Sequence, residues 1–481
     1  MFLMRDFKIT CMNNSSNPAS INQFLLEQTR KHVDNKFEAA LGVLSDLVRI
    51  PGIAWEAFDS AKLELSAEAV AGLFRETGVF DEVEIRRSSA HGKLGAPAIL
   101  AKRAARNSKP TVLLYAHHDV QPPGDEAVWK TDPFEPAIID GRMFGRGAAD
   151  DKAGIIAHLT AVETLRDLTD NDFDLGLTIF IEGEEEAGSP TFRNFLDENK
   201  ADLEADVIIV ADSSNWTESV PALTTTLRGL VSLVIEISTL DHALHSGMYG
   251  GVVPDAMLAM IRLLATLHDE KGSVAVAGLH QTQAANLPYP EADLRRDAGV
   301  PASVSLIGEG SILDRIWTKP SLTVIGIDGQ SVALSSNTML PSVRAKISMR
   351  IAPGQVPEDA LELLKRHLQA HLPFGANINF GETELGKPFE ADSAGWAKKL
   401  AESALSAAWQ SDSVDIGIGG SIPFIADLTE VFPAAQILVT GVEDPDSRAH
   451  SPNESVHLES LKNAMVAESL FLLAGNDLTI N

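Results

Sequence analysis

Short apolar runs and longer amphipathic stretches alternate along most of this 481-residue chain. Four runs rich in apolar and β-branched residues have the length of buried strands, at 111–116, 175–181, 206–211 and 436–440. Apolar positions recur with the 3.6-residue period of a helix at 36–49, 61–77, 255–268, 357–371, 395–408 and 456–473. This alternation predicts an α/β fold in which helices flank a mixed sheet.

A second group of elements interrupts this pattern, in a chain that is too long for a single core. Strand-like stretches at 231–237, 344–351 and 376–381 surround two of the helical stretches, in an order that predicts a separate α/β sandwich. We therefore expect a discontinuous main domain, formed by residues 21–226 and 388–481, and an inserted domain at 227–387. Residues 1–20 contain the polar run CMNNSSNPAS and are expected to form a flexible tail.

The charge balance and the single cysteine narrow the choice of partners and compartment. Lys plus Arg is 39 and Asp plus Glu is 67, which gives a formal net charge of −28. Such a chain is repelled by nucleic acid and by anionic membrane surfaces, so neither is an expected partner. No apolar run is long enough to span a bilayer, and the first ten residues lack a signal-peptide core. Cys11 alone cannot form an intrachain disulfide, which favours a reducing compartment, and we expect the cytoplasm.

Acidic residues and histidines follow the predicted strands at the points where these end. The first strand runs into His-His-Asp, the second into a run with four glutamates in five positions, and the third into an aspartate. Strand ends of one sheet often meet at a common edge, where polar clusters face a cleft. With an aspartate from a glycine-rich turn and a histidine from a late loop, five candidate metal ligands result: His117, Asp150, Glu186, Asp212 and His450.

Each of these residues also has an ordinary explanation. The His117 segment equally fits a surface turn after a strand, because His-x-Asp is common by chance. Asp150 fits a helix N-cap, the acidic run fits a solvated loop, and His450 fits a solvated loop residue. The metal-site interpretation rests instead on three strand ends that together bring a histidine and acids to one edge of the sheet. Since thiolate ligands are excluded, a metal there would be held by His, Asp and Glu, which suits Zn or Mn.

Two further carboxylates, Asp119 and Glu185, stand beside the candidate ligands. Side chains alternate along an extended chain, so His117 and Asp119 project to the same face. If His117 binds metal through one ring nitrogen, Asp119 can hold the other nitrogen and fix the orientation of the ring. Glu185 immediately precedes the candidate ligand Glu186.

Several segments of the chain carry a family resemblance. They are YAHHDVQP at 115–122, Trp129, DPF at 132–134, DG at 140–141, GRGAADDK at 145–152, IEGEEEAGS at 181–189, LHSGMYGG at 244–251, GGSIP at 419–423 and AHSPNE at 449–454. In this order they resemble the M20 metallopeptidases, in particular the carnosinase-like dipeptidases. Each segment is weak alone, but the ordered set is specific and extends from about residue 111 to residue 454.

The resemblance implies a catalytic site with two divalent metal ions in the main domain. Asp150 would bridge the two ions, His117 and Asp212 would complete one ion, and Glu186 and His450 would complete the other. Glu185 would be the general base that takes a proton from the attacking water and passes it to the leaving nitrogen of a small peptide. Similar enzymes also hold the peptide bond after the bridging aspartate in the cis form, which is Asp150-Asp151 here.

The resemblance also assigns roles to the inserted domain, which would act as a lid and dimerise. A homodimer is expected, in which His245 reaches into the partner's site and binds the reaction oxyanion; the alternative is a hydrogen-bonded loop histidine beside His242. Three positions match substrate-binding residues of the carnosinase-like group: Thr338, Arg350 and Ser421. For Arg350, whose planar guanidinium suits a substrate carboxylate, the ordinary alternative is a surface ion pair.

Three residues depart from the family pattern and put carnosinase selectivity in question. Gly417 and Ile418 replace an expected Arg-Glu pair, and Lys387 stands where a substrate-contacting histidine is typical. The expected activity is hydrolysis of dipeptides or short peptides. An N-acyl-amino-acid deacylase or carboxypeptidase of the same family is the nearest alternative. A catalytically silent relative that binds peptides is the alternative from another class, although Glu185 and all five candidate ligands are present.

Overall fold

The computed structural model describes residues 21–420 and 422–478. The predicted tail over residues 1–20, with Cys11, and the predicted substrate residue Ser421 lie outside the described residues. Within the described ranges, no helix has both the length and the apolar character needed to cross a membrane.

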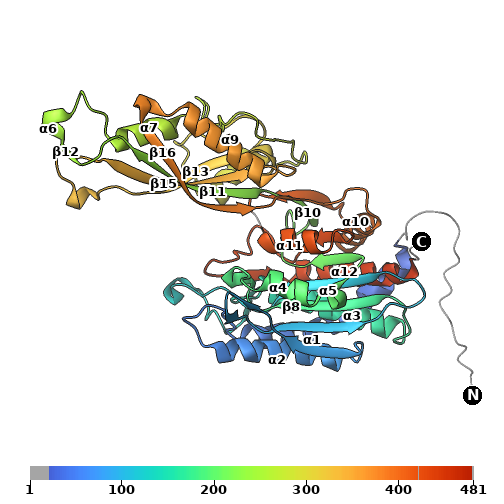
Figure 1. Cartoon of the computed structure of the whole chain (residues 1–481). Coiled ribbons are helices and arrows are strands. Elements are labelled where there is room, and N and C mark those ends of the chain that lie inside the picture. Colours follow the sequence, from blue (N-terminus) through green and yellow to red (C-terminus); the bar gives the residue numbers. More distant parts are fainter. Residues whose placement is uncertain (1–20, 421, 479–481) are drawn as a thin grey trace, which may run out of the picture.

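A nine-stranded mixed sheet forms the larger part of the molecule (Figure 1). Its strands follow the order β1-β4-β8-β5-β9-β19-β10-β17, and β18 pairs with β10 off this path. Neighbours β8, β5, β9 and β19 are parallel, whereas β1, β4 and β17 join their neighbours in antiparallel fashion. The strands are β1 (Glu82–Arg86), β4 (Ala98–Arg103), β5 (Thr111–His117), β8 (Gly176–Glu182), β9 (Val207–Val210), β10 (Ala222–Leu227), β17 (Phe389–Glu390), β18 (Val414–Ile418) and β19 (Gln436–Val439).

Helices cover both faces of this sheet, because its central strands are apolar on both sides. Along β5, Val112 and Leu114 belong to one core cluster and Leu113 and Tyr115 to the other. The first cluster includes residues of α1 (Gln23–Val48), α2 (Ser60–Glu76), α3 (Lys152–Leu168), α10 (Trp396–Trp409) and α12 (Leu458–Asp477). The second includes residues of α4 (Phe192–Glu198), α5 (Lys200–Leu203) and α11 (Pro423–Val431). The predicted arrangement of helices around a mixed sheet is therefore confirmed.

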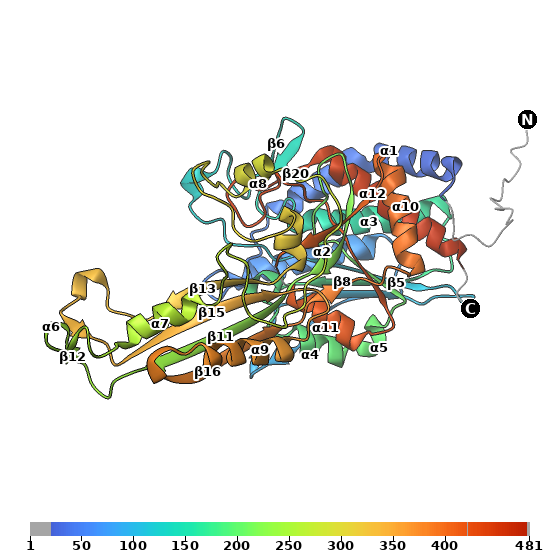
Figure 2. The ribbon, with the colours of Figure 1, turned by 90° about the horizontal axis from the view of Figure 1, so that it is seen from above.

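A separate four-stranded antiparallel sheet, in the order β13-β15-β11-β16, forms the second unit. Two amphipathic helices, α7 (Ala256–Ala265) and α9 (Pro357–Ala370), pack on it around their own apolar core. The strands are β11 (Gly229–Ser238), β13 (Ser321–Ile327), β15 (Ser342–Ile351) and β16 (Asn377–Gly386). The unit also carries α8 (Glu291–Asp297) and, at its far end, β12 (Leu244–His245), α6 (Ser246–Tyr249) and β14 (Thr338–Met339) (Figure 2). This inserted α/β unit was predicted, although strand β13 was not.

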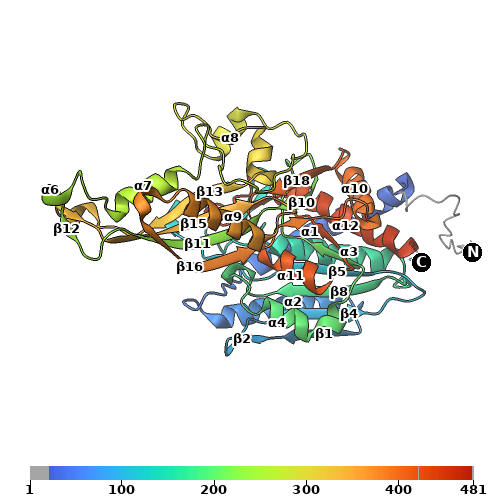
Figure 3. The same ribbon diagram turned by 45° about the horizontal axis from the view of Figure 1, so that its top comes forward.

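The chain passes twice between the two sheets, from β10 to β11 and from β16 to β17 (Figure 3). The two passages lie against each other. A Cβ atom at Gly229 would come within 2.5 Å of the carbonyl oxygen of Gly386 and 2.8 Å of the nitrogen of Pro388. A residue without a side chain is therefore required at this crossing.

Candidate metal centre

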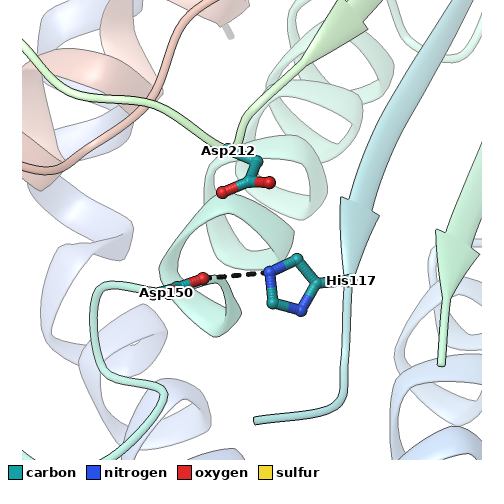
Figure 4. A group of neighbouring side chains, drawn as sticks. All are labelled: His117, Asp150 and Asp212. Carbon is teal, nitrogen blue, oxygen red and sulfur yellow. Dashed lines mark hydrogen bonds and ion pairs between the residues drawn. The ribbon is translucent and has the colours of Figure 1, made fainter. Parts of the chain in front are cut away.

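The five predicted ligands lie together at one edge of the large sheet. Their ligand atoms form two groups, each with all atoms within 4.8 Å of one another: His117, Asp150 and Asp212, and Asp150, Glu186 and His450. Asp150 belongs to both groups. Figure 4 shows the first group, in which side chains from the end of a strand and from two loops point toward one another.

The topology of the sheet explains why residues so far apart in sequence meet. Strands β8, β5 and β9 are parallel neighbours, so their carboxyl ends share one edge. His117 is the last residue of β5, Asp212 follows β9 by two residues, and Glu186 follows β8 by four. Asp150 stands just before α3, and the Asp150-Asp151 peptide bond is cis, as predicted. His450 comes from the loop between β19 and β20 (Ser455–His457).

The two oxygens of the Asp150 carboxylate face different histidines. Its Oδ1 lies 3.0 Å from Nε2 of His117, and its Oδ2 lies 3.0 Å from Nε2 of His450. The same His450 nitrogen lies 3.1 Å from Oε2 of Glu186. Burial by itself raises the pKa of Asp150, yet hydrogen bonds to His117 and His450 hold that pKa well below its ordinary value. Asp150 is therefore an anion placed between two groups of ligands.

Other acids of the site are crowded together in a buried environment. Burial, aided by the charge of Asp212, raises the pKa of Glu185 to about 9. Burial, together with the charges of Asp150 and Glu186, raises the pKa of Asp212 to about 7. Repulsion of this kind between buried carboxylates is relieved by cations. The donor set of two imidazoles and three carboxylates, which holds no thiolate, fits divalent metal ions.

Asp119 contacts more of the site than predicted. The Nδ1 atom of His117 lies 3.1 Å from the backbone carbonyl oxygen of Asp119 and 3.4 Å from its carboxylate. A carbonyl oxygen can only accept, so Nδ1 carries a proton, and Nε2 is the ring nitrogen that faces the ligand group. The Asp119 carboxylate also accepts hydrogen bonds from the backbone N–H groups of Glu185 (3.2 Å) and Glu186 (3.1 Å). One residue thus orients His117 and the turn that carries both glutamates.

Two residues that support the ligands were not singled out from the sequence. Gln121 donates its backbone N–H to Oε1 of Glu186 (3.1 Å) and its side-chain amide to Oε2 (2.7 Å). Glu454, which is fully buried, accepts the backbone N–H of Asp150 (3.1 Å) and forms an ion pair with Arg146 (2.5 Å). Both lie in segments that carry the resemblance, at 115–122 and 449–454, but their contacts are not visible in a one-dimensional pattern.

The structure does not bring His245 and Thr338 to the ligands of the same chain. They are direct partners in the two-stranded β12-β14 pairing, at the end of the second unit farthest from the large sheet (Figure 1). His245 is exposed, and its Nδ1 accepts the backbone N–H of Gly247 at 3.1 Å. The two predicted residues therefore lie side by side, away from both ligand groups.

The remaining predicted residues lie near the junction of the two units. Arg350 is the next-to-last residue of β15, opposite Leu230 of β11. Lys387 forms an exposed ion pair with Glu430, with 2.7 Å between nitrogen and oxygen. A Cβ atom at Gly417 would lie 2.8 Å from Cβ of Trp317. The packing of Trp317 accounts for the absence of a side chain at this position.

Comparisons with known proteins show the family of this chain. The model of a protein family described as Peptidase family M20/M25/M40 matches residues 113–473. The chain is 34% identical to a cysteinylglycine-S-conjugate dipeptidase from Corynebacterium striatum, over 79% of this chain and 84% of the relative. It is 29% identical to a Beta-Ala-His dipeptidase from Rattus norvegicus, over 75% of this chain and 76% of the relative. The chain therefore belongs to the M20/M25/M40 peptidase family, which confirms the resemblance.

Solved structures share the fold over nearly the whole chain. Human carnosine dipeptidase 1 has a TM-score of 0.71 with 24% identity, covering 94% of this chain and 99% of that one. The metallo-carboxypeptidase Sso-CP2 from Sulfolobus solfataricus has a TM-score of 0.74 with 22% identity, covering 91% and 99%. This likeness supports the arrangement of a main domain and an inserted unit.

Proposed function

We propose that this protein is a metal-dependent dipeptidase that hydrolyses the peptide bond of dipeptides or short peptides. One observation carries the proposal: two groups of metal-ligand atoms share Asp150, at the edge of the sheet where its parallel strands end. Membership of a peptidase family supports it, as do the names of relatives that are themselves dipeptidases. The proposed ligands are His117, Asp150, Glu186, Asp212 and His450.

Two divalent ions held by these residues would supply an acidified water and a positive charge for the substrate carbonyl oxygen. Zn or Mn suits the nitrogen and oxygen donors. The ring of His117 would present its Nε2 lone pair, since Nδ1 is engaged by Asp119. Gln121 would hold both oxygens of Glu186 in place through its two hydrogen bonds.

Glu185 is the proposed general base. Its pKa of about 9 belongs to a buried carboxyl among other acids, and positive charge at the site lowers that pKa and favours the carboxylate. The carboxylate would accept a proton from the attacking water and then transfer it to the leaving nitrogen. Its backbone N–H is held by Asp119, which fixes the position of the turn that bears it.

We also propose that residues 227–387 form a lid and dimerisation domain between the catalytic segments 21–226 and 388–481, and that the protein acts as a homodimer. Edge strand β13 supports this, because Ile325 and Ile327 are 57% and 47% exposed, and Ile261 of α7, which packs on the same sheet, is also exposed. His245 and Thr338 lie at the end of this unit, so a partner could receive both in its site. The cytoplasm remains the proposed compartment.

Arg350 and Ser421, with Thr338, are the proposed substrate-binding residues. A panel of dipeptides, tested beside N-acyl amino acids with added Zn or Mn and again with a chelator, distinguishes the possible activities. The proposal expects chelator-sensitive release of amino acids from dipeptides. Cleavage of N-acyl amino acids alone would instead assign a deacylase, and metal binding without any hydrolysis would assign a silent relative.

A further inference from the structure

Arg228 occupies the junction between the two units. It is the one residue between β10 of the large sheet and β11 of the small sheet, and it is only 8% exposed. A buried guanidinium needs several acceptors, and carboxylates are its most favourable partners. The partners of Arg228 therefore indicate what its charge does.

Its guanidinium donates to groups from both units. Nε donates to the carbonyl oxygen of Gly419 (2.9 Å), in the loop that follows β18. Nη1 donates to the hydroxyl of Ser321 (3.0 Å), the first residue of β13, and to the carbonyl oxygens of Lys319 (3.3 Å) and Arg315 (3.4 Å). These four acceptors, which all lie in the ranges that the structure describes, are neutral oxygens. They therefore leave the positive charge of Arg228 unbalanced.

The loop at Gly419 is packed tightly against this side chain. A Cβ atom at Gly419 would come 2.8 Å from Nη2 of Arg228 and 2.7 Å from the carbonyl oxygen of Ile316. A side chain at this position would push the loop away from both. Gly419 and Arg228 thus hold the loop against a segment of the inserted unit.

Arg350 lies at the same junction. It is the direct cross-strand partner of Ser321, and residues directly opposite in antiparallel strands place their side chains on one face of the sheet. The Ser321 hydroxyl that binds Arg228 therefore shares a face with Arg350. Burial, together with the charge of Arg350, lowers the pKa of Arg228 to about 10. Two positively charged side chains that both neighbour Ser321 favour an anion there.

We propose that Arg228 is a positioning residue for the carboxylate end of the substrate: it holds the Gly419 loop against the strand pair that carries Arg350, and its charge adds to that of Arg350. The inference rests on the proposed dipeptidase function, in which Arg350 meets the substrate carboxylate. Selectivity for peptides with a free carboxyl terminus would then depend on a side chain that need not touch the substrate.

The test compares a dipeptide that the wild type hydrolyses with the C-terminal amide of the same dipeptide. In Arg228→Lys a planar fork with several donors is replaced by a point charge, which cannot hold the loop and Ser321 together. We expect KM for the free acid to rise about tenfold, while kcat and metal content change less than about twofold. The preference for the acid over the amide should fall by a similar factor.

Arg103→Lys is the matched control. Arg103 also donates to backbone carbonyl oxygens, those of Val79 and Phe173, but within the large unit only. This variant should keep the wild-type preference for the acid. Should Arg228→Lys fail to fold, Ser321→Ala, which removes one acceptor, should shift the preference in the same direction by a smaller factor.

An unchanged acid-to-amide preference in Arg228→Lys, or in Ser321→Ala where only that variant folds, would overturn this inference and leave the proposed dipeptidase function standing. A lower kcat at unchanged KM would overturn it as well. If the wild type hydrolyses no dipeptide at all, the proposed function itself is wrong, so the two failures are distinguishable.

Discussion

The carboxylate of Asp119 accepts a hydrogen bond from the backbone N–H of Glu185 at 3.2 Å, while its own carbonyl oxygen lies 3.1 Å from Nδ1 of His117. The residue proposed to orient a metal ligand therefore also holds the proposed general base. A defect in Asp119 should disturb metal binding and proton transfer together.

Asp119→Asn tests this double role. An amide has one oxygen where the carboxylate has two, and its NH₂ group would oppose one of the backbone N–H donors of Glu185 and Glu186. We expect metal affinity or kcat to fall by about 10- to 100-fold, the usual effect of losing a group that supports a metal ligand. Metal titration and steady-state kinetics measure the two effects.

Asp59→Asn provides the matched control, because Asp59 caps α2 through the N–H of Ala61 and asparagine is an equally good cap. This variant should behave as the wild type. Wild-type affinity and turnover in Asp119→Asn would show that Asp119 does not orient the site.

Stability should depend on pH through a buried pair behind the site. His158 of α3 lies 2.7 Å from Glu468 of α12, and its other nitrogen lies 3.0 Å from the carbonyl oxygen of Tyr115. Burial lowers the pKa of His158, but the charge and hydrogen bond of Glu468 outweigh it, so the net pKa is raised. The protonated pair therefore stabilises the fold below the unfolded pKa of about 6.5, and this contribution declines as pH rises through the folded pKa.

Glu468→Gln removes the charge of the pair and keeps its shape. We expect this variant to lose about 3 kcal/mol of unfolding free energy near pH 6, with a smaller loss at pH 9. Chemical denaturation at several pH values measures the difference from the wild type. A difference that is constant or grows with pH would mean that His158 is neutral in the folded protein.

Complementation between two inactive variants tests whether His245 acts in the partner's site. Glu185→Gln and His245→Ala should each be inactive as homodimers. In a mixed dimer, one site combines an intact Glu185 with the partner's intact His245. Random exchange gives mixed dimers about half of the time, so activity should return to roughly a quarter of wild type.

Activity that stays at the level of the separate variants after confirmed subunit exchange would exclude a shared site. Full activity of the His245→Ala homodimer would exclude any catalytic role for this histidine. Metal content measured in both variants should equal that of the wild type, which checks that neither substitution acts through loss of the ions.

The proposed dimer surface can be tested at the two edges of the small sheet. Ile325→Lys places a charge on β13, where a neighbouring strand would pair, and should give a monomer that binds metal but turns over slowly. Leu385→Lys is the control on the opposite edge strand β16, where Leu385 is 38% exposed. Light scattering measures the mass of each. A dimeric Ile325→Lys together with a monomeric Leu385→Lys would place the interface on β16 instead.

Much of the fold could be predicted because buried strands and amphipathic helices have clear periodicities. Helix α9 was expected at 357–371 and spans Pro357–Ala370. The helix expected at 36–49 begins instead at Gln23. Thr29 and Val33 are its only buried residues before Leu41, and Thr29 is polar, so the apolar periodicity of its first turns is weak. Strand β13 was missed although its sequence SLTVIGI is β-branched, since most of its residues are exposed and show no alternation.

The candidate ligands could be found because they follow strand ends, where parallel topology brings neighbours together. The hydrogen bonds by which Gln121 and Glu454 support the ligands could not be predicted, because they are tertiary contacts between residues 65 and 304 positions apart in the sequence. The pairing of His245 with Thr338 likewise depends on the path of the chain at the end of the inserted unit.

Metal content and turnover, measured on one preparation of Glu185→Gln, test the proposed mechanism most directly. Glutamine keeps the size of the side chain but cannot accept the proton, and Glu185 belongs to neither group of ligand atoms. The mechanism predicts two divalent ions per chain, as in the wild type, and a kcat for dipeptides reduced at least about 1000-fold. Wild-type turnover at full metal content would contradict Glu185 as the base, and loss of the ions would make it a ligand instead.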